Sequence, residues 1–441
     1  MFEVLSWTYR FVYIFITSAF CISCYLVYLK GKSFLSYLIP FLNILLVGSG
    51  FALLSYYEPI DYRAIYVGSG LLAVYIFSRF ITGKLLATKD LLLFDVVFHL
   101  LSIGLLILYR LSPDYGVKQA YFALAGIFVF FAVIIAMKLL EIKEKHYILL
   151  WGLILALLIV TQLFGTEING SKNWINLHYT LVQPSEFIKI LFVFFISCIL
   201  SKDLDLKRFM WTSAAVLTVV AFFALQRDMG SAFLFFTAYL TVLLANDIKC
   251  YYTLLSACAA ALGGLVSYFT FSYIKYRVLA WVNPWKYIAG KSYQITQSLF
   301  AVASGGLIGT GIFLGDPKYI PAVHTDFIFS AISEETGILS AMALVAIYTL
   351  LTLISMDISF KAGNKIYSNA ALGLTSLTAI QTLIIVCGVL NIIPITGVTL
   401  PLISYGGSSL LSQFINVGLL YYIKEKRQEQ HENAQPSAEL R

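Results

Sequence analysis

A single acid stands where a polar connection gives way to an apolar segment of this chain. Asp326 lies in the run His324–Ser330, and Ser330 and Glu334 follow it four and eight residues later. If the apolar segment is helical, this spacing places the three side chains on one face. A carboxylate beside a hydrocarbon span is costly and is usually retained for function. Asp326 is therefore the first candidate for a catalytic group.

A second pair of charges opens another apolar segment. In the run Gln183–Lys189, Pro184 stands at the first helical position and Glu186 at the third, where an acid caps free N–H groups. Capping alone would explain Glu186, but it does not explain Lys189, one turn deeper in the segment. The two residues are three apart and can pair on one helix face. A buried pair of this kind usually marks a substrate or ion path.

Two segments are rich in turn-forming residues. Gln226–Gly230 places Arg227 and Asp228 in a tight turn, which by itself is ordinary turn chemistry. Asn391–Ser409 is punctuated by proline and glycine and contains Ser404. Irregular backbone at membrane depth survives only where protein or a water-filled cavity satisfies its polar groups. This segment therefore predicts a cavity.

Two further features have ordinary structural explanations. Ser304–Gly311 is dense in glycine but lacks the Gly-Lys-Ser/Thr ending of a phosphate-binding loop, so it indicates a turn with tight backbone packing. Trp174 could be an interfacial aromatic residue or part of a functional site, and the sequence leaves both readings open.

Composition assigns the class of protein that must position these residues. Of 441 residues, 60% are hydrophobic and 12% are charged, and the mean hydropathy is +0.84. Soluble domains carry about 25% charged residues, so this is a polytopic membrane protein. The first apolar segment is too long and too weakly charged at its front for a cleaved signal peptide. The six cysteines lie in or beside apolar segments and are expected to be packing residues.

Apolar segments of about 20 residues, long enough to cross a bilayer, recur along the whole chain. They predict about thirteen spans, near residues 8–29, 34–56, 65–81, 91–109, 119–138, 147–164, 182–200, 210–225, 231–246, 251–272, 327–354, 368–390 and 405–424. The fold class is thus all-α and polytopic. The tail 428–441 is polar and is expected to be disordered.

Positive charge gathers in alternate loops, which places those loops in the cytoplasm. The N-terminus is then outside, the C-terminus is inside, and the segments around 165–186, 226–230 and 272–326 face outside. The net charge of +7 is explained by these inner loops and does not require nucleic acid. The inner-face residues are Lys30, Lys32, Arg79, Lys84, Lys89, Lys138, Lys143, Lys145, Lys202, Lys207, Arg208, Lys361, Lys365, Lys424, Lys426 and Arg427.

The predicted outer loop from Ser272 to Asp326 is basic, against this tendency. Long loops escape the rule, which is one explanation. The other is that its cations meet an anionic ligand such as a phosphate. These cations are Lys275, Arg277, Lys286, Lys291 and Lys318.

Taken together, and in order along residues 90 to 424, these motifs resemble the SEDS family (shape, elongation, division and sporulation), the RodA/FtsW/SpoVE type of bacterial cell-wall polymerase. Asp95 also resembles the acid that opens the family's first helix, although His99, four residues on, could simply pair with it. The motifs are Gly-Ser-x-x-Trp with Gln-Pro-Ser-Glu-x-x-Lys at 170–189, Gln-x-Asp-x-Gly at 226–230, Arg277 with Asn283-Pro284, Tyr293 with Gln297-Ser298 and Ser304-Gly305-Gly306, His-Thr-Asp-Phe-Ile-Phe at 324–329 with Glu334-Glu335-x-Gly337, and Thr-Leu-Pro-x-x-Ser-Tyr-Gly-Gly-Ser-Ser at 399–409.

The resemblance implies a domain organisation. Residues 86–424 would form the family core of about ten transmembrane helices with a large extracellular loop, and 425–441 a cytoplasmic tail. Residues 1–85 would add about three transmembrane helices that carry no recognisable motif. They could be a packing appendage, a docking surface for a partner or a lineage-specific accessory.

The resemblance also implies a reaction, which is polymerisation of lipid II into glycan strands on the outer face of the membrane in elongation, division or sporulation. Asp326 would be the catalytic base, Lys189, Arg277 and Lys291 would meet the pyrophosphate, and a divalent cation (Mg or Mn) could assist. A class B penicillin-binding protein is the implied transpeptidase partner. The expected substrate-binding residues are Trp174, Glu186, Lys189, Asp228, Arg277, Lys291, Gln297, Ser304, His324 and Ser404.

Two other classes of function are compatible with many spans. A lipid II flippase or other transporter would often show repeated halves and mid-membrane charges, whereas here no convincing repeat is seen and the charged motifs gather at span ends. A non-catalytic division scaffold would not need Glu186, Lys189, Asp228 and Asp326 together. Glycan ladders made from lipid II would distinguish the polymerase from both.

Overall fold

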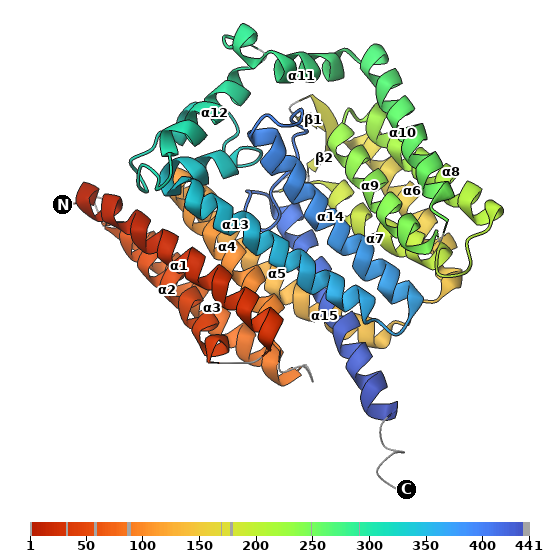
Figure 1. Cartoon of the computed structure of the whole chain (residues 1–441), viewed down its shortest axis with the longest axis horizontal. Coiled ribbons are helices and arrows are strands. Elements are labelled where there is room, and N and C mark those ends of the chain that lie inside the picture. Colours follow the sequence, from red (N-terminus) through yellow and green to blue (C-terminus); the bar gives the residue numbers. More distant parts are fainter. Residues whose placement is uncertain are drawn as a thin grey trace, which may run out of the picture. The chain divides into compact units, whose positions relative to one another are not determined.

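The computed structural model describes residues 2–31, 34–56, 60–85, 90–168, 170–176, 180–247, 249–290 and 292–434, and this part of the chain is mainly helical (Figure 1). The helices are α1 (Phe2–Lys30), α2 (Leu35–Ser55), α3 (Tyr62–Leu85), α4 (Leu92–Leu111), α5 (Pro113–Leu139), α6 (Tyr147–Phe164), α7 (Pro184–Ile199), α8 (Leu206–Leu225), α9 (Met229–Asn246), α10 (Tyr251–Thr270), α11 (Ser272–Val282), α12 (Tyr293–Gly305), α13 (Ile328–Phe360), α14 (Lys365–Val389) and α15 (Gly407–Ala434). Three single turns are η1 (Glu144–His146), η2 (Pro284–Tyr287) and η3 (Pro317–Tyr319). One antiparallel sheet has the order β1 (Thr166–Ile168), β2 (Ser171–Asn176), β3 (Leu181–Val182).

Each of the thirteen predicted spans coincides with one helix. Within the described residues, 11 helices are long and apolar enough to cross a membrane. The two predicted spans outside this set are α7, which has 16 residues, and α15, which runs on into the polar end of the chain. The prediction of an all-α polytopic membrane protein is confirmed.

Three predictions about irregular segments need correction. The predicted outer loop contains two helices, α11 and α12. The sequence analysis missed them because helices this short do not produce an apolar run of span length. Asp326 lies in a turn that ends just before α13, as the predicted start of that span implied, so helical spacing to Ser330 and Glu334 does not by itself place the three side chains on one face. Helix α15 continues to Ala434, so residues 428–434 are helical, whereas 435–441 lie outside the described residues.

The first of two compact units comprises Met1–Ile127, Tyr276–Ile354 and Thr382–Gly406. Its centre is α4, whose apolar residues are buried along the length of the helix. Helices α1, α2 and α3 pack against it, so the N-terminal residues are an integral part of this unit. The predicted domain boundaries at residues 85 and 424 stay a prediction. The two units are defined by contacts in space, and each unit combines segments that are separated in the sequence.

A buried polar network joins α2, α3 and α4. The Asp95 carboxylate accepts hydrogen bonds from the Arg79 guanidinium at 2.9 and 3.2 Å and from the Tyr75 hydroxyl at 2.6 Å. His99 Nδ1 lies 2.7 Å from Asn43 Oδ1. The sequence suggested that His99 could pair with Asp95. Instead the acid pairs with an arginine from another helix, whose guanidinium donates two hydrogen bonds to the carboxylate.

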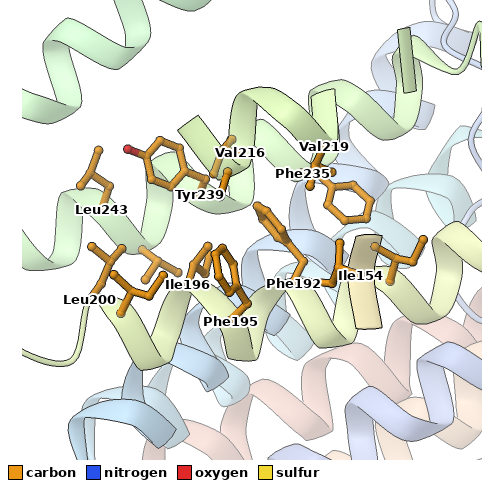
Figure 2. Close-up of a cluster of buried hydrophobic side chains, with 14 of the residues drawn as sticks. Ile154, Phe192, Phe195, Ile196, Leu200, Val216, Val219, Phe235, Tyr239 and Leu243 are labelled. Carbon is orange, nitrogen blue, oxygen red and sulfur yellow. The ribbon is translucent and has the colours of Figure 1, made fainter. Parts of the chain in front are cut away.

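The second unit comprises Phe128–Lys275, Ser355–Gln381 and Gly407–Arg441. Its core is formed by apolar side chains of α6, α7, α8 and α9, several of which are aromatic (Figure 2). Phe192 and Phe235, for example, are fully buried and meet edge to face with ring centroids 5.0 Å apart. This packing fixes the start of α7, where the predicted charge pair stands.

Candidate active site

Asp326 is held by the backbone on both sides of it. Its N–H donates to the Ala322 carbonyl at 3.3 Å, which closes the turn before α13. The Thr325 carbonyl accepts from the Ser404 hydroxyl, and the His324 carbonyl accepts from the Tyr405 N–H at 2.8 Å. The segment after α14 therefore positions the residues that flank Asp326.

A narrow cleft lies in front of the Asp326 carboxylate. Its walls come from the end of α14, from Ile384 to Val389, and from the following segment Ile395–Val398. Its volume is about 200 Å³, including the open mouth. Only about 10 Å³ of this space is open to the centre of a water molecule, which is roughly the room that one water needs. The cleft can admit a hydroxyl group to Asp326, while a sugar ring would have to lie outside it.

Gly397 lines this cleft in a backbone conformation that favours glycine. Its φ of +78° is a conformation that L side chains rarely adopt. A Cβ at this position would also lie 3.5 Å from the Asp326 carboxylate and 3.8 Å from the Arg277 guanidinium. The backbone conformation therefore favours glycine here, and the two distances, which are ordinary van der Waals contacts, place Gly397 beside both charges.

Arg277 stands at the same cleft on α11. Its guanidinium donates to the Thr396 carbonyl at 3.0 Å. Helix α11 is further tied to this region by a reciprocal pair, in which Trp281 Nε1 donates to the Asn391 carbonyl and Asn391 Nδ2 to the Trp281 carbonyl. An acid and a cation from distant parts of the chain thus share one small site.

The surroundings change the acidity of Asp326. Desolvation raises its pKa to about 6, against smaller opposing effects from the Thr325 hydroxyl and the Arg277 charge. Although some of its surface is accessible, the carboxyl group is crowded by the walls of the cleft. A carboxylate with a pKa near 6 is largely ionised at neutral pH and is a better base than an ordinary aspartate.

His324 and Ser404 lie beside Asp326 in the chain or in space, and each makes contacts with other parts of the first unit. The His324 ring stacks on Tyr115 with centroids 4.4 Å apart, and desolvation lowers its pKa. The Ser404 hydroxyl also accepts from the Leu400 N–H at 2.8 Å. These contacts support a role in positioning the Asp326 turn, while direct contact with a substrate stays a prediction.

The predicted pair of Glu186 and Lys189 is formed in the second unit. The Lys189 ammonium lies 2.8 Å from Glu186 Oε1, and both side chains are about 95% buried. Two residues from distant helices complete the network. Gln381 Oε1 accepts from Lys189 at 3.3 Å, and the Ser412 hydroxyl donates to Glu186 Oε2 at 2.7 Å. The prediction that the pair forms is confirmed, and its role in binding stays a prediction.

Asp228 organises a junction between β2 and α9. It caps the helix by accepting from the Ser231 N–H at 3.0 Å, and it also accepts from the Ser231 hydroxyl and from Asn173 Nδ2, each at 2.7 Å. Trp174 is the next residue of β2 and is half-buried, and its carbonyl accepts from the Thr166 hydroxyl. Asp228 therefore fixes the strand that carries Trp174.

The other predicted residues are more dispersed. Gln297 is half-buried on α12, and Ser304 is exposed at the end of that helix, where its hydroxyl donates to the Ala301 carbonyl. Lys291 lies outside the described residues. The structure thus groups Asp326, Arg277, His324 and Ser404 in the first unit, and Glu186 with Lys189 in the second. That all these residues serve one site stays a prediction.

The residues at the cleft do not themselves form a metal site. Among the described residues, no three acids, histidines or cysteines come together closely enough to hold a metal ion. The predicted divalent cation is therefore not matched by a set of protein ligands. It stays a prediction, and no reaction step is derived through it.

Several residues that shape these sites were missed by the sequence analysis. Gly397 lies in a segment for which a cavity was predicted, but only its positive φ and its two charged neighbours single it out. Gln381 and Ser412 are ordinary polar residues of apolar helices, and Asn173 is one of many turn-forming residues. A polar side chain within a span was the only available signal, and that signal is shared by many structural residues.

Comparisons with known proteins agree with one another. The family model FTSW_RODA_SPOVE, described as "Cell cycle protein", matches residues 90–429. The chain is 33% identical over 365 residues to the peptidoglycan glycosyltransferase RodA of Mycobacterium tuberculosis, covering 75% of this chain and 77% of that protein. It is 31% identical over 354 residues to the stage V sporulation protein E of Bacillus subtilis, covering 76% and 96%.

Solved structures share the fold. A chain from a peptidoglycan synthase complex, studied for its structural coordination of polymerization and crosslinking, matches with a TM-score of 0.66 at 23% identity, covering 77% of this chain and 98% of that one. The rod shape determining protein RodA of Thermus thermophilus matches with a TM-score of 0.58 at 22% identity, covering 77% and 97%. In each case about a quarter of this chain lies outside the match.

Proposed function

The chain belongs to the FtsW/RodA/SpoVE family of peptidoglycan glycosyltransferases, and we propose that it polymerises lipid II into glycan strands with Asp326 as the catalytic base. The observation that carries this proposal is the cleft in which the carboxylate, Arg277 and Gly397 converge. Because the chain belongs to this family, its role is in cell elongation, division or sporulation, as in the relatives that it matches.

In the proposed reaction, the growing strand linked to undecaprenyl pyrophosphate is the donor and the GlcNAc 4-hydroxyl of lipid II is the acceptor. Asp326 takes the proton from the acceptor hydroxyl as its oxygen attacks the anomeric carbon of the donor. The bond from that carbon to the pyrophosphate oxygen breaks, and undecaprenyl pyrophosphate leaves with the electron pair. One displacement converts an α donor into a β-1,4 product, so the anomeric centre inverts.

The departing pyrophosphate needs positive charge, because negative charge develops on it in the transition state. Arg277 is the candidate in the first unit, since its guanidinium is held by a backbone carbonyl at the Asp326 cleft. Lys189 is the candidate in the second unit. Glu186 and Gln381 already bind its ammonium, so a pyrophosphate would compete with or join that network.

Purified chain supplied with fluorescent lipid II is the direct test of this function. We expect glycan ladders whose synthesis increases when a class B penicillin-binding protein, the proposed transpeptidase partner, is added. The similarity to a chain from a peptidoglycan synthase complex supports a synthase partner of this kind. Movement of lipid II across vesicles without ladders would favour a flippase instead, and neither activity would favour a scaffold.

We further propose that the site faces outward, with the N-terminus outside and the C-terminus in the cytoplasm, on the basis of loop charge. In a cysteine-free background, single cysteines at Glu167 and Lys318, which are both exposed, should react with an impermeant thiol reagent on wall-stripped cells. Cysteines at Lys143 and Lys361 should react only after lysis. Asn173 is unsuitable because it is buried against Asp228.

A cysteine at Glu3 tests the number of added helices. Three spans before the core should make it react from outside, whereas two or four should make it react only after lysis. Protection of Lys318 until lysis would refute the outward orientation, because the proposed chemistry requires lipid II at the outer face.

A further inference from the structure

Helix α13, which follows Asp326, is broken at Gly337. This residue has φ +83° and ψ 169°, which no helix contains. The break separates a short half-helix, Ile328–Thr336, from a longer one that runs to Phe360. Breaking a helix leaves carbonyl groups unpaired on one side and N–H groups unpaired on the other. Within a membrane protein, such groups must find partners in the protein itself.

The glycine insert, defined here as Gly306–Gly311, supplies those partners. On the near side of the break, the Thr310 N–H donates to the Glu334 carbonyl at 2.9 Å and the Gly311 N–H to the Glu335 carbonyl at 3.0 Å. On the far side, the roles reverse. The Ile338 N–H donates to the Gly306 carbonyl at 3.0 Å, and the Leu339 N–H to the Leu307 carbonyl at 3.2 Å.

This pairing explains the density of glycine that the sequence showed. A Cβ on Gly309 would lie 2.3 Å from the Glu335 carbonyl oxygen, and one on Gly337 would lie 2.4 Å from the Gly309 nitrogen. The expected tight backbone packing is therefore confirmed, and its purpose is to fill the break in α13.

A third carbonyl of the glycine insert is bound by a residue that belongs neither to the insert nor to α13. The Gly309 carbonyl accepts a hydrogen bond from the guanidinium of Arg10, on α1. Arg10 is 7% exposed, and its guanidinium carbon lies 4.3 Å from the Trp7 ring centroid and 5.0 Å from that of Phe11. Among the described residues, no carboxylate lies within ion-pair distance of it. A buried arginine without an acid is costly in a membrane helix and points to a function.

The half-helix links this contact to the proposed catalytic site. Ile328–Thr336 is only about 13 Å long at 1.5 Å per residue, and Asp326 stands two residues before it. At its start, the Ser330 hydroxyl is 2.7 Å from that of Ser298. At its end, the glycine insert binds its last carbonyls. A shift of the insert would therefore move a short rigid element whose other end carries Asp326.

We propose that Arg10 is a positioning residue for glycan polymerisation, which holds the glycine insert in the break of α13 and thereby orients Asp326. The proposal rests on the proposed function of the Asp326 site. It gives a role to α1, which precedes the residues matched by the family model at 90–429. Helix α1 then acts as a support for the half-helix that follows Asp326.

The test compares Arg10→Met, Arg10→Lys and Lys30→Met in the full chain. Lys30→Met is the matched control, because it removes an exposed cation from the other end of α1. Arg10→Met should lower kcat for lipid II at least tenfold with KM unchanged. Arg10→Lys keeps a charged donor and should recover most of the activity, and Lys30→Met should behave as wild type.

Hydrogen–deuterium exchange provides a readout that needs no substrate. Arg10→Met should exchange faster than wild type in peptides covering 306–311 and 328–336, and Lys30→Met should not. If Arg10→Met fails to fold, Arg10→Gln, which keeps a neutral donor, takes its place with the same expected directions.

The outcomes distinguish a failure of the proposed function from a failure of the proposed role of Arg10. A wild-type chain that makes no glycan would contradict the proposed function. An active wild type with an equally active Arg10→Met would overturn the role of Arg10, and so would a loss of kcat with unchanged exchange in both peptides.

Discussion

Asp326→Asn should abolish glycan synthesis while leaving the protein folded. Removing a general base costs typically a factor of about 10²–10⁴ in rate, which would place residual activity at or below detection in a ladder assay. The fold should survive because burial raises the pKa of Asp326, so the folded state disfavours the charge that the substitution removes. Thermal unfolding and co-purification with the proposed transpeptidase partner measure that survival.

The matched control for this change is Asp316→Asn. Asp316 is an exposed acid on the same connection between α12 and α13. Its backbone N–H donates to the Glu334 carboxylate at 2.9 Å and its backbone carbonyl accepts from the Tyr319 N–H at 3.2 Å, so both of these contacts are made by the backbone and not by the side chain that the substitution changes. It should retain wild-type ladders. Wild-type ladders from Asp326→Asn would exclude Asp326 as the base, and equal loss in both variants would indicate a general effect of charge on this connection.

The same assignment predicts how the wild-type rate depends on pH. A base works only when ionised, and the Asp326 pKa is raised to about 6. The value of kcat/KM should therefore be flat above this pH and should fall about tenfold per unit below it. Had the pKa kept its ordinary value near 4, the rate would hold down to that pH. Observing such a low limit would contradict the raised pKa of this carboxyl.

Lys189→Met should reduce polymerisation by a factor of about 10²–10³, the cost of losing one group that stabilises developing charge. It should also destabilise the protein, because it leaves the buried Glu186 carboxylate without its cation, at a cost of about 3–5 kcal/mol. Glu186→Gln should reduce polymerisation less, since the amide can still bind Ser412 and Lys189 and hold the ammonium in place. It should also lower stability, because it leaves the buried Lys189 ammonium without its anion. Ladder assays and thermal unfolding of the same preparations separate the two effects.

The double variant Glu186→Gln with Lys189→Met distinguishes chemistry from folding. It removes the unpaired buried charge, so thermal stability should recover relative to Lys189→Met. Activity should not recover if Lys189 meets the pyrophosphate. Recovery of both would mean that the pair is purely structural. An inactive Glu186→Gln beside an active Lys189→Met would show that Glu186 acts directly. Lys202→Met, which removes an exposed cation just beyond α7, is the control for charge alone.

Local spacing predicted the contacts that lie within one element. Glu186 and Lys189 pair as their separation of three residues indicates, because such residues are neighbours on any helix. The same reasoning failed for Asp95 and His99. Their spacing permits a contact, but the Asp95 carboxylate forms an ion pair with Arg79 of another helix instead. Spacing gives the residues that can meet, and competing partners from other elements decide which of them do.

The break in α13 shows a similar limit. Residues 327–354 read as one continuous span, because a single glycine is tolerated in a helical pattern. The break is stable only because the glycine insert, more than twenty residues earlier in the chain, supplies hydrogen bonds to both sides of it. Nothing in the sequence of α13 itself reports that those partners exist.

The sequence by itself determined the membrane class, the position of the long apolar helices and the identity of the charged candidates, because the length of an apolar run and the rarity of charge within it are properties of the chain alone. Only the tertiary structure decided that Arg277 and Gly397 share a cleft with Asp326, that Gln381 and Ser412 complete the Glu186 network, and that Arg10 supports the break in α13. Those contacts join residues far apart in the sequence. They depend on the directions in which helices pack, and periodicity along a single element carries no record of those directions.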